Sequence, residues 1–443
     1  MKPTLCLCIA LVISCFFSLH AVNLAAPARL PNTLPGMNTP GFWINLHPNP
    51  DSLVIANQQI AEFNERVHKQ GTVTRIVQHA KTYSGSAIRK EIRESLRKLK
   101  SVAKYDSSGF GISEALWDSL LQNANVEEVP PSVQVRFGFP AKLTNQRLAP
   151  SELNLNSDSL DVEFDQLQNS GYDMGTPTVF YHDSADGLWV YGACSTSSGW
   201  YRKSDVCFLY RTDWLNYIRA ESKVVVTKAK ADIWRDAEAR NLLTFCRIGT
   251  AFPLLGESGA YYQIQIPKMD GFSIAYLAKE DAHKGYLPYT ARNVYKLAFV
   301  TLGTGYGWGD SYGDFDCSSL LKHVFSCFGI FLPRNGLQQA KAAALLYEFS
   351  PGDSTAFRDS VIVNLALPAI TFLRLSGHIM LYLGAYNGKP YVLHDIWGYR
   401  CPDGTGKDDI LVVNKTVVSD LSLGEGSKRN TLLQRLTTVS AVR

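Results

Sequence analysis

The spacing of apolar and polar residues divides the chain into a helical part, a strand-rich part and a mixed part. Helices are expected at about 52–70, capped by Asp51 or Ser52, and at about 84–99, where apolar residues recur at helical spacing and Lys and Arg fill the opposite face. From about 131 to 285, short runs of β-branched and aromatic residues alternate with Gly, Asn, Asp and Ser, which predicts short strands and turns. Beyond 285, helices are expected before strands, an order typical of α+β domains.

Length and composition indicate a modular globular protein. A chain of 443 residues exceeds what one hydrophobic core organises, so two to four domains are expected. Apolar residues make up 46% and charged residues 19%, and no long acidic or basic block occurs. The formal net charge of +4 is too small for a nucleic-acid footprint, so no nucleic-acid partner is expected.

The first 21 residues follow the plan of a secretory signal. A lysine near the start is followed by an apolar run over 5–17 and by Ser-Leu-His-Ala, which predicts export to the periplasm or the extracellular space. In an alternative interpretation, residues 12–15 form a lipoprotein processing box, and Cys15 becomes a lipid anchor. No later stretch approaches the roughly 20 apolar residues of a membrane span, so no integral span is expected.

Six cysteines follow this leader, and none of them forms a Cys-x-x-Cys pair. Structural zinc is therefore not expected. In an oxidising compartment some of the five besides Cys317 could pair, and Cys194 with Cys207 is the candidate on spacing alone.

Residues that can carry chemistry gather in the last third of the chain. A Gly- and aromatic-rich run at 302–310 precedes Asp-Cys-Ser at 316–318, and Ser-Gly-His at 376–378 and His394 follow downstream. Cys317 opens a predicted helix whose apolar residues lie three, four, seven and eleven positions further on. Because free N–H groups and the dipole of a helix N-terminus favour a thiolate, we expect a lowered pKa for this cysteine.

The two downstream histidines lie on apolar runs joined by Tyr-Asn-Gly-Lys at 386–389, a hairpin signal. A two-residue turn would place His378 and His394 on opposite faces of the sheet. A three-residue loop with Gly388 as a left-handed bulge residue would pair Met380 with His394 and make the histidines diagonal neighbours on one face. We therefore expect a loop of odd length or a bulge. By contrast, a third histidine, six positions after the cysteine at 323, should point away from it.

Together these motifs closely resemble the NlpC type of papain-like cysteine peptidases over roughly 286–443. The resemblance implies an α+β catalytic domain in which Cys317 is the nucleophile, His378 is the base and His394 orients the base. It also implies that Tyr306 lies beside the nucleophile and, with the backbone N–H of the cysteine, holds the developing oxyanion. A thiol and an imidazole suffice for hydrolysis, so no cofactor and no metal are implied.

The same resemblance implies a substrate, the γ-D-glutamyl–diaminopimelate bond in peptidoglycan stem peptides. Asp316 and Ser318 resemble residues that receive the free amine of a stem peptide starting at L-Ala, although Asp316 could instead be a helix N-cap. Arg334 opens a further family-like stretch and is a candidate substrate contact. Asn335-Gly336 stands where the family usually has Asp-Ser, and Asp310 where it tends to have Gly, and both departures argue against a charged pocket for a free N-terminus.

Two segments of the strand-rich part, at 199–206 and 271–277, end in similar aromatic strands and resemble tandem bacterial SH3-like barrels. The fold class expected is thus a multidomain one, with two small all-β barrels and an N-terminal helical arm ahead of the peptidase. In relatives the first barrel closes the substrate side of the cleft. Trp200 and Tyr201 are the candidates for that contact, unless they form barrel core. The domains expected are a signal peptide (1–21), an N-terminal arm and helical stabilising domain (27–110), two SH3-like domains (111–213 and 214–285) and the peptidase (286–443).

Two rival functions are compatible with the sequence. An N-acetylmuramoyl-L-alanine amidase on a related fold would share the chain order of cysteine before histidine. A non-catalytic wall-binding protein could be built from SH3-like modules, but it is disfavoured because all three catalytic positions carry competent residues.

Overall fold

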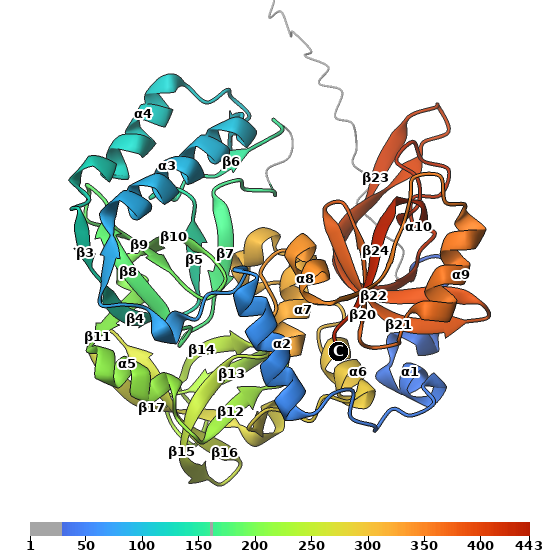
Figure 1. Cartoon of the computed structure of the whole chain (residues 1–443), viewed down its shortest axis with the longest axis horizontal. Helices are drawn as coiled ribbons and strands as arrows, with labels where there is room; N and C mark the ends of the chain where they lie inside the picture. The colour runs from blue at the N-terminus through green and yellow to red at the C-terminus, as the bar shows by residue number, and fades with distance from the viewer. Residues whose placement is uncertain (1–28, 160–162) are drawn as a thin grey trace, which may run out of the picture.

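The structure is a computed structural model that describes residues 29–159 and 163–443 (Figure 1). The signal peptide expected at 1–21 and the alternative anchor at Cys15 lie outside the described residues. Among the helices of the described ranges, none is both long enough and apolar enough to cross a membrane.

The N-terminal helices belong to two different cores. The predicted helices appear as α2 (Asn57–Lys69) and α3 (Gly85–Val102), and α3 is capped by the Ser84 hydroxyl. α1 (Pro40–Leu46) and α2 pack with apolar residues of the C-terminal part, whereas α3 and α4 (Glu114–Asn123) pack against the first β-sheet (Figure 1). Residues 27–110 therefore contribute to both cores.

The first large sheet contains seven antiparallel strands in the order β11-β4-β8-β9-β10-β5-β7. In chain order these are β4 (Arg136–Pro140), β5 (Thr144–Arg147), β7 (Gln168–Tyr172), β8 (Thr178–Asp183), β9 (Trp189–Ala193), β10 (Ser198–Arg202) and β11 (Val206–Leu209). α5 (Arg211–Ile218) packs against the sheet, and the indole of Trp214 donates a hydrogen bond to the carbonyl of Gly138. Two short pairs stand beside it, β1 (Thr82–Ser84) with β3 (Ser132–Gln134) and β2 (Tyr105–Asp106) with β6 (Leu155–Asn156).

A second sheet of seven strands follows, in the order β14-β13-β17-β16-β15-β12-β18. Its strands are β12 (Lys223–Val226), β13 (Lys230–Trp234), β14 (Leu242–Arg247), β15 (Ala251–Ser258), β16 (Tyr261–Lys268), β17 (Gly271–Ala278) and β18 (Ala282–Lys284). The sheet encloses a core of its own that includes Val224, Ile233 and Phe252. The strand-rich pattern predicted between 131 and 285 is therefore confirmed.

The C-terminal part places a six-stranded sheet between helices. The order is β19-β24-β20-β21-β22-β23, with β19 (Ala344–Glu348), β20 (Thr371–Leu375), β21 (His378–Tyr386), β22 (Lys389–Pro402), β23 (Asp408–Asp420) and β24 (Leu436–Ala441). α6 (Ala291–Phe299), α7 (Cys317–Ser326) and α8 (Gly336–Ala342) share a core with Leu381 and Leu393. α9 (Thr355–Leu365) and α10 (Leu432–Arg435) share another with Met380 and Val392, so helices cover both faces.

The hairpin between β21 and β22 differs from the predicted one in its loop. Tyr386 pairs with Lys389 across a two-residue turn in which both central residues have positive φ, so the three-residue loop was wrong. The register then shifts between Tyr382 and Gly384, because Leu383 forms a bulge, and Leu381 pairs with Leu393. Continuing this register places Met380 opposite His394. The predicted pairing is thus reached through a bulge four residues before the turn.

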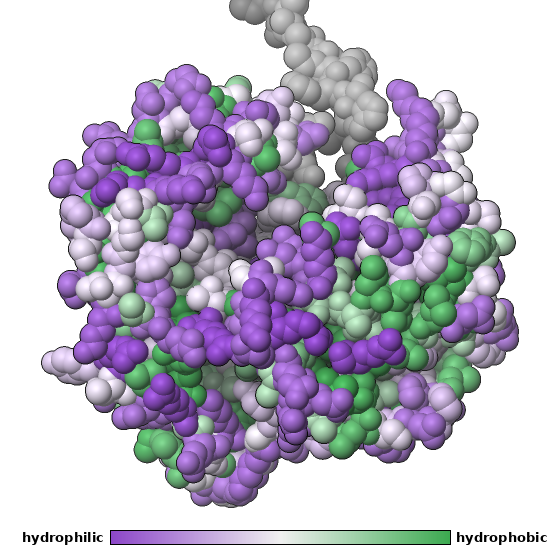
Figure 2. All heavy atoms as spheres, viewed as in Figure 1, coloured by the Kyte–Doolittle hydropathy of each residue, from purple (hydrophilic) through white to green (hydrophobic). Residues whose placement is uncertain are grey.

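Surface polarity differs between the two ends of the molecule. In the view of Figure 2, α3 and α4 show a largely hydrophilic surface, whereas apolar side chains gather over the C-terminal side near α1 and α9. α9 carries the exposed residues Phe357 and Leu365.

Candidate active site

Cys317 is the first residue of α7, as the sequence predicted. The carboxylate of Asp316 caps this helix by accepting hydrogen bonds from the backbone N–H groups of Ser318 (3.1 Å) and Ser319 (2.9 Å). The cysteine lines a cavity of about 380 Å³ whose other walls include Tyr306, Trp308 and His378. The helix therefore presents its half-buried thiol to a space that can hold a ligand.

The protonation state of the Cys317 thiol differs from the prediction. Burial, followed by the neighbouring carboxylate of Asp316, raises the pKa of Cys317 to about 12, so the expected lowered pKa was wrong. Burial, with a smaller effect from Arg435, lowers the pKa of His378 to about 4. At neutral pH the pair is therefore a neutral thiol and a neutral imidazole, and the proton has to move during attack.

His378 and His394 form the start of a chain of hydrogen bonds. Nε2 of His378 lies 2.7 Å from Nδ1 of His394, and Nε2 of His394 lies 3.0 Å from the hydroxyl of Ser419. That hydroxyl donates its proton to the carbonyl oxygen of Asp420 at 2.7 Å. Since the serine proton is committed to the carbonyl, the serine oxygen accepts the Nε2 proton of His394.

This chain fixes the tautomer of both rings. With its proton on Nε2, His394 presents a lone pair on Nδ1, which accepts the Nε2 proton of His378. His378 then carries a lone pair on Nδ1, the form that a general base needs. His394 is fully buried, and burial followed by His378 lowers its pKa well below the usual value, so it acts as a neutral orienting group. The diagonal contact that the sequence predicted is present.

Tyr306 lines the same cavity and lies close to the nucleophile in the fold. A bridge of backbone pairing joins it to Phe315, and its N–H donates to the carbonyl of Asn414. Burial, and then the nearby Cys317, raises the pKa of its phenol far above neutral pH. The phenol therefore remains a hydrogen-bond donor, as an oxyanion contact requires.

A cluster of buried charged side chains lies next to the nucleophile. Arg334 makes two hydrogen bonds to the carboxylate of Asp316, at 2.6 and 3.1 Å, and a third to the hydroxyl of Ser318 at 3.0 Å. Asp310 lies 3.6 Å from Arg334 and 3.4 Å from Arg247. Of the two roles considered for Asp316, the N-cap is observed, and its carboxylate is also engaged by an arginine.

The expected contact of Trp200 and Tyr201 with the cleft was wrong. Both side chains are fully buried: Trp200 packs against Tyr191, and the hydroxyl of Tyr201 accepts a hydrogen bond from Gln146. On β10, both side chains therefore belong to the hydrophobic core around the first sheet and not to the cleft.

The first sheet reaches the cavity through a different strand, β7. Gln168 and Asn169 line the cavity, and the amide of Gln168 donates to the carbonyl of Gly309 at 2.9 Å. Just before β7, Phe164 contacts Trp308 and Trp397. Sequence reasoning missed these residues and Ser419, because a polar run and a lone serine carry no motif.

Two further predictions concern residues outside the site. His323 does not line the cavity, and its Nδ1 lies 2.9 Å from the carbonyl of Ile248, so the prediction that it points away is confirmed. Cys194 and Cys207 are both free, as are the other cysteines of the described ranges, so the suggested disulfide is wrong for this structure.

Comparison with known proteins identifies two regions. Residues 154–202 match the SH3 domain of the SH3b1 type, and residues 303–395 match the NlpC/P60 family. A curated relative from Bacillus subtilis (strain 168), gamma-D-glutamyl-L-lysine dipeptidyl-peptidase, is 26% identical over 151 residues, which cover 32% of this chain and 45% of the relative. The chain thus spans less than half of that protein.

One solved structure extends the likeness of fold over nearly the whole chain. The structure of an NlpC/P60 endopeptidase from Photobacterium damselae subsp. piscicida is 20% identical, with a TM-score of 0.75 over 95% of this chain and 98% of the other. An NlpC/P60 family protein from Bacillus cereus ATCC 10987 is 15% identical, with a TM-score of 0.48 over 69% of this chain and 99% of the other. The family match contains the Asp-Cys-Ser step and both site histidines, and the SH3 match contains the strand that reaches the cavity. The chain therefore contains a region of the NlpC/P60 family, at residues 303–395, preceded by an SH3 domain of the SH3b1 type at residues 154–202.

Proposed function

We propose that this protein is a cysteine peptidase that hydrolyses peptide bonds of cell-wall peptidoglycan. The observation that carries the proposal is the hydrogen-bonded chain from His378 through His394 to Ser419, which leaves a basic nitrogen on a histidine that shares its cavity with Cys317. The match to the NlpC/P60 family and the peptidase name of the Bacillus relative support the reaction class.

In this mechanism the thiol and the imidazole react as neutral partners. As the sulfur of Cys317 attacks the carbonyl carbon, its proton passes to Nδ1 of His378, and His394 stabilises the imidazolium by accepting a hydrogen bond from its Nε2–H. The backbone N–H of Cys317 and the phenol of Tyr306 donate to the oxyanion. His378 then gives the proton to the leaving amine. Water hydrolyses the remaining thioester, again with His378 as the base, and restores the thiol.

The bond we propose is that between γ-D-glutamate and meso-diaminopimelate of a stem peptide. The relative's name, which specifies a γ-D-glutamyl bond to a diamino acid, supports this choice. Asp316, Ser318 and Arg334 line the same cavity as the nucleophile and are the proposed contacts for the L-Ala end of the substrate. Because Arg334 already engages Asp316, a free amine would have to share that carboxylate with the guanidinium.

Mass spectrometry of defined tri- and tetrapeptide muropeptides tests the proposal. New amino ends on diaminopimelate would support it, whereas released L-Ala amino ends would establish the amidase instead. Comparing substrates with a free and a blocked L-Ala amine tests the contact with Asp316. Cys317→Ser and Cys317→Ala should abolish cleavage; if both cleave normally while deletion of the SH3 part removes wall binding, the binding-protein alternative is correct.

The finer domain plan is part of the same proposal. We assign the second seven-stranded sheet (214–285) as a second SH3-like barrel, the preceding one to 111–213, residues 27–110 to a stabilising arm, and 286–443 to a papain-like peptidase. We also propose export to the periplasm or the extracellular space, where peptidoglycan lies. The N-terminus and mass of the mature protein would distinguish cleavage after Ala21 from a lipidated Cys15, and an uncut N-terminus would contradict export by either route.

A further inference from the structure

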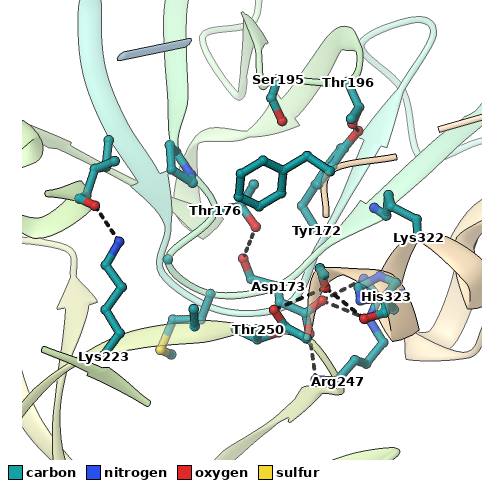
Figure 3. A pocket seen from close by; sticks show the side chains of 18 of the residues that line it. Tyr172, Asp173, Thr176, Ser195, Thr196, Lys223, Arg247, Thr250, Lys322 and His323 are labelled. Atoms are coloured by element: carbon teal, nitrogen blue, oxygen red, sulfur yellow. Dashed lines mark hydrogen bonds and ion pairs between the residues drawn. The ribbon is translucent and has the colours of Figure 1, made fainter. Parts of the chain in front are cut away.

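A second cavity, of about 290 Å³, lies where the two seven-stranded sheets meet the C-terminal part (Figure 3). The first sheet and its loops supply residues 172–177 and 195–196, the second sheet supplies Lys223, Arg247 and residues 249–251, and α7 supplies Lys322 with its neighbour His323. None of its lining residues lines the cavity of Cys317. Any ligand here would therefore occupy a site separate from the proposed reaction.

The charge of this second cavity is unbalanced. Lys223 and Lys322 approach it from opposite walls (Figure 3), and within the described residues neither lysine forms an ion pair with a carboxylate. Lys223 donates only to the carbonyl of Ile218, and Lys322 lies 5.4 Å from the ring centre of Tyr172. Burial lowers the pKa of both lysines, so a bound anion would relieve the cost of their charge.

The acidic side chain of the lining cannot serve as their counter-ion. Asp173 is the only carboxylate among the lining residues, and it is already bound by the buried guanidinium of Arg247 at 2.8 and 2.9 Å and by its backbone N–H at 2.9 Å. With this pair neutral and the histidine uncharged, the lining residues themselves carry the two positive charges of the lysines. Outside the lining, the buried carboxylate of Asp310 attracts Lys322, but the two form no ion pair among the described residues.

Two buried polar atoms of the same lining lack hydrogen-bond partners. They are the hydroxyl of Tyr217 and Nε2 of His323. Nδ1 of His323 donates to the carbonyl of Ile248, and burial lowers the pKa of this histidine to about 3, so its Nε2 is an acceptor. Buried polar groups in folded proteins are nearly always paired. A ligand with both an acidic group and an N–H or O–H donor would pair with the lysines and with these two unpaired polar atoms.

The rest of the lining mixes hydroxyl-bearing side chains with apolar ones, and the apolar ones include Met174, Pro177, Pro253 and Leu332. Pockets for small organic molecules combine such walls with a few placed polar groups, whereas an inorganic anion gains nothing from them. We propose that this cavity binds a small organic acid, with its carboxylate on Lys322, its apolar body against the apolar walls, and an amide or hydroxyl donor toward His323 and Tyr217, while the positive charge of Lys223 on the opposite wall favours the anion.

Calorimetric titration of the whole protein tests this site with probes that are not peptidase substrates. N-acetylleucine supplies a carboxylate, an apolar body and an N–H donor, and in N-acetylleucine amide an uncharged carboxamide of similar size replaces the carboxylate. We expect saturable binding of the acid in the millimolar range or tighter. The amide should bind at least about tenfold more weakly, since a charged hydrogen bond is lost.

Substitutions of single lysines test whether the acid binds in this cavity. Lys322→Met should weaken binding of the acid about tenfold or more, Lys322→Arg should retain most of it, and Lys341→Met, at an exposed lysine of α8, should leave it unchanged. Melting temperatures confirm that each variant is folded. Equal binding of acid and amide, binding of inorganic phosphate alone, an unchanged affinity in folded Lys322→Met, or no saturation by the acid in the millimolar range would each overturn the proposal.

Discussion

Replacing Ser419 with Ala removes the oxygen that accepts the Nε2 proton of His394. The serine side chain is fully buried, so water does not replace it, and the ring is left with an unpaired donor. An unsatisfied buried donor costs about 1–3 kcal/mol. The same energy favours the other tautomer of His394, which places a proton on Nδ1, opposite Nε2 of His378, and pushes the proton of His378 onto the nitrogen that should act as base.

If this tautomer bias is lost at the transition state, 1–3 kcal/mol corresponds to a fall in kcat of roughly 5- to 150-fold. KM should change little, because neither Ser419 nor His394 lines the cavity of Cys317. Steady-state kinetics on a defined muropeptide would measure both constants. Ser419→Thr, which keeps the hydroxyl, should recover most of the loss.

A matched control comes from the same sheet. Ser440 on β24 is also fully buried, and its hydroxyl has no hydrogen-bond partner. Ser440→Ala should therefore leave kcat unchanged while making an equivalent change in the core. A folded Ser419→Ala variant that retains kcat within about twofold of the wild type would lie below the expected range and refute the tautomer argument.

Three further predictions concern charge and packing. Because the pKa of His378 is lowered to about 4, kcat/KM should stay constant through neutral pH and fall only as the pH drops toward that value. The melting temperature should fall between about pH 6.5 and 4, because the histidine takes up its proton in the unfolded state before it does so in the folded state. A loss of activity centred near pH 6.5 would contradict this. Asp310→Ala should lower the free energy of unfolding by about 1–3 kcal/mol in urea titrations, because Arg247 and Arg334 keep Asp173 and Asp316 but lose the carboxylate between them, and the buried hydroxyl of Ser170 loses its acceptor; an unchanged midpoint would contradict this. Trp200→Ala should cost a similar 3–5 kcal/mol as a core truncation, and a raised KM in a still-folded protein would restore its expected substrate role.

The sequence was sufficient to predict the elements that carry the nucleophile and the base, because local rules determine them. An aspartate before a run at helical spacing predicts a capped helix, and Cys317 stands at its start. Asn-Gly between two apolar runs predicts a hairpin, and the turn has the simple two-residue form that this dipeptide favours. Of the two alternatives that the sequence left open, a loop of odd length and a bulge, the bulge is observed.

Features that depend on tertiary contacts were not predictable. The pKa of Cys317 is raised because burial outweighs the helix terminus, and burial depends on chain segments far away in sequence. The strand by which the first sheet meets the cavity could not be read from aromatic residues, since Trp200 and Tyr201 fill the sheet's own core while the polar Gln168 reaches out.

The bulge at Leu383 links the local hairpin signal with the tertiary packing around it. A regular continuation of the two-residue turn would pair His378 with Trp397 and place His394 on the opposite face, so the chain of hydrogen bonds to Ser419 could not form. One extra residue in β21 reverses the side-chain alternation beyond the bulge and leaves the turn undisturbed. The bulge residue is itself almost fully buried, within the core that contains Leu321 of α7. The packing that seats the nucleophile's helix on the sheet therefore also holds the register that brings the two histidines together.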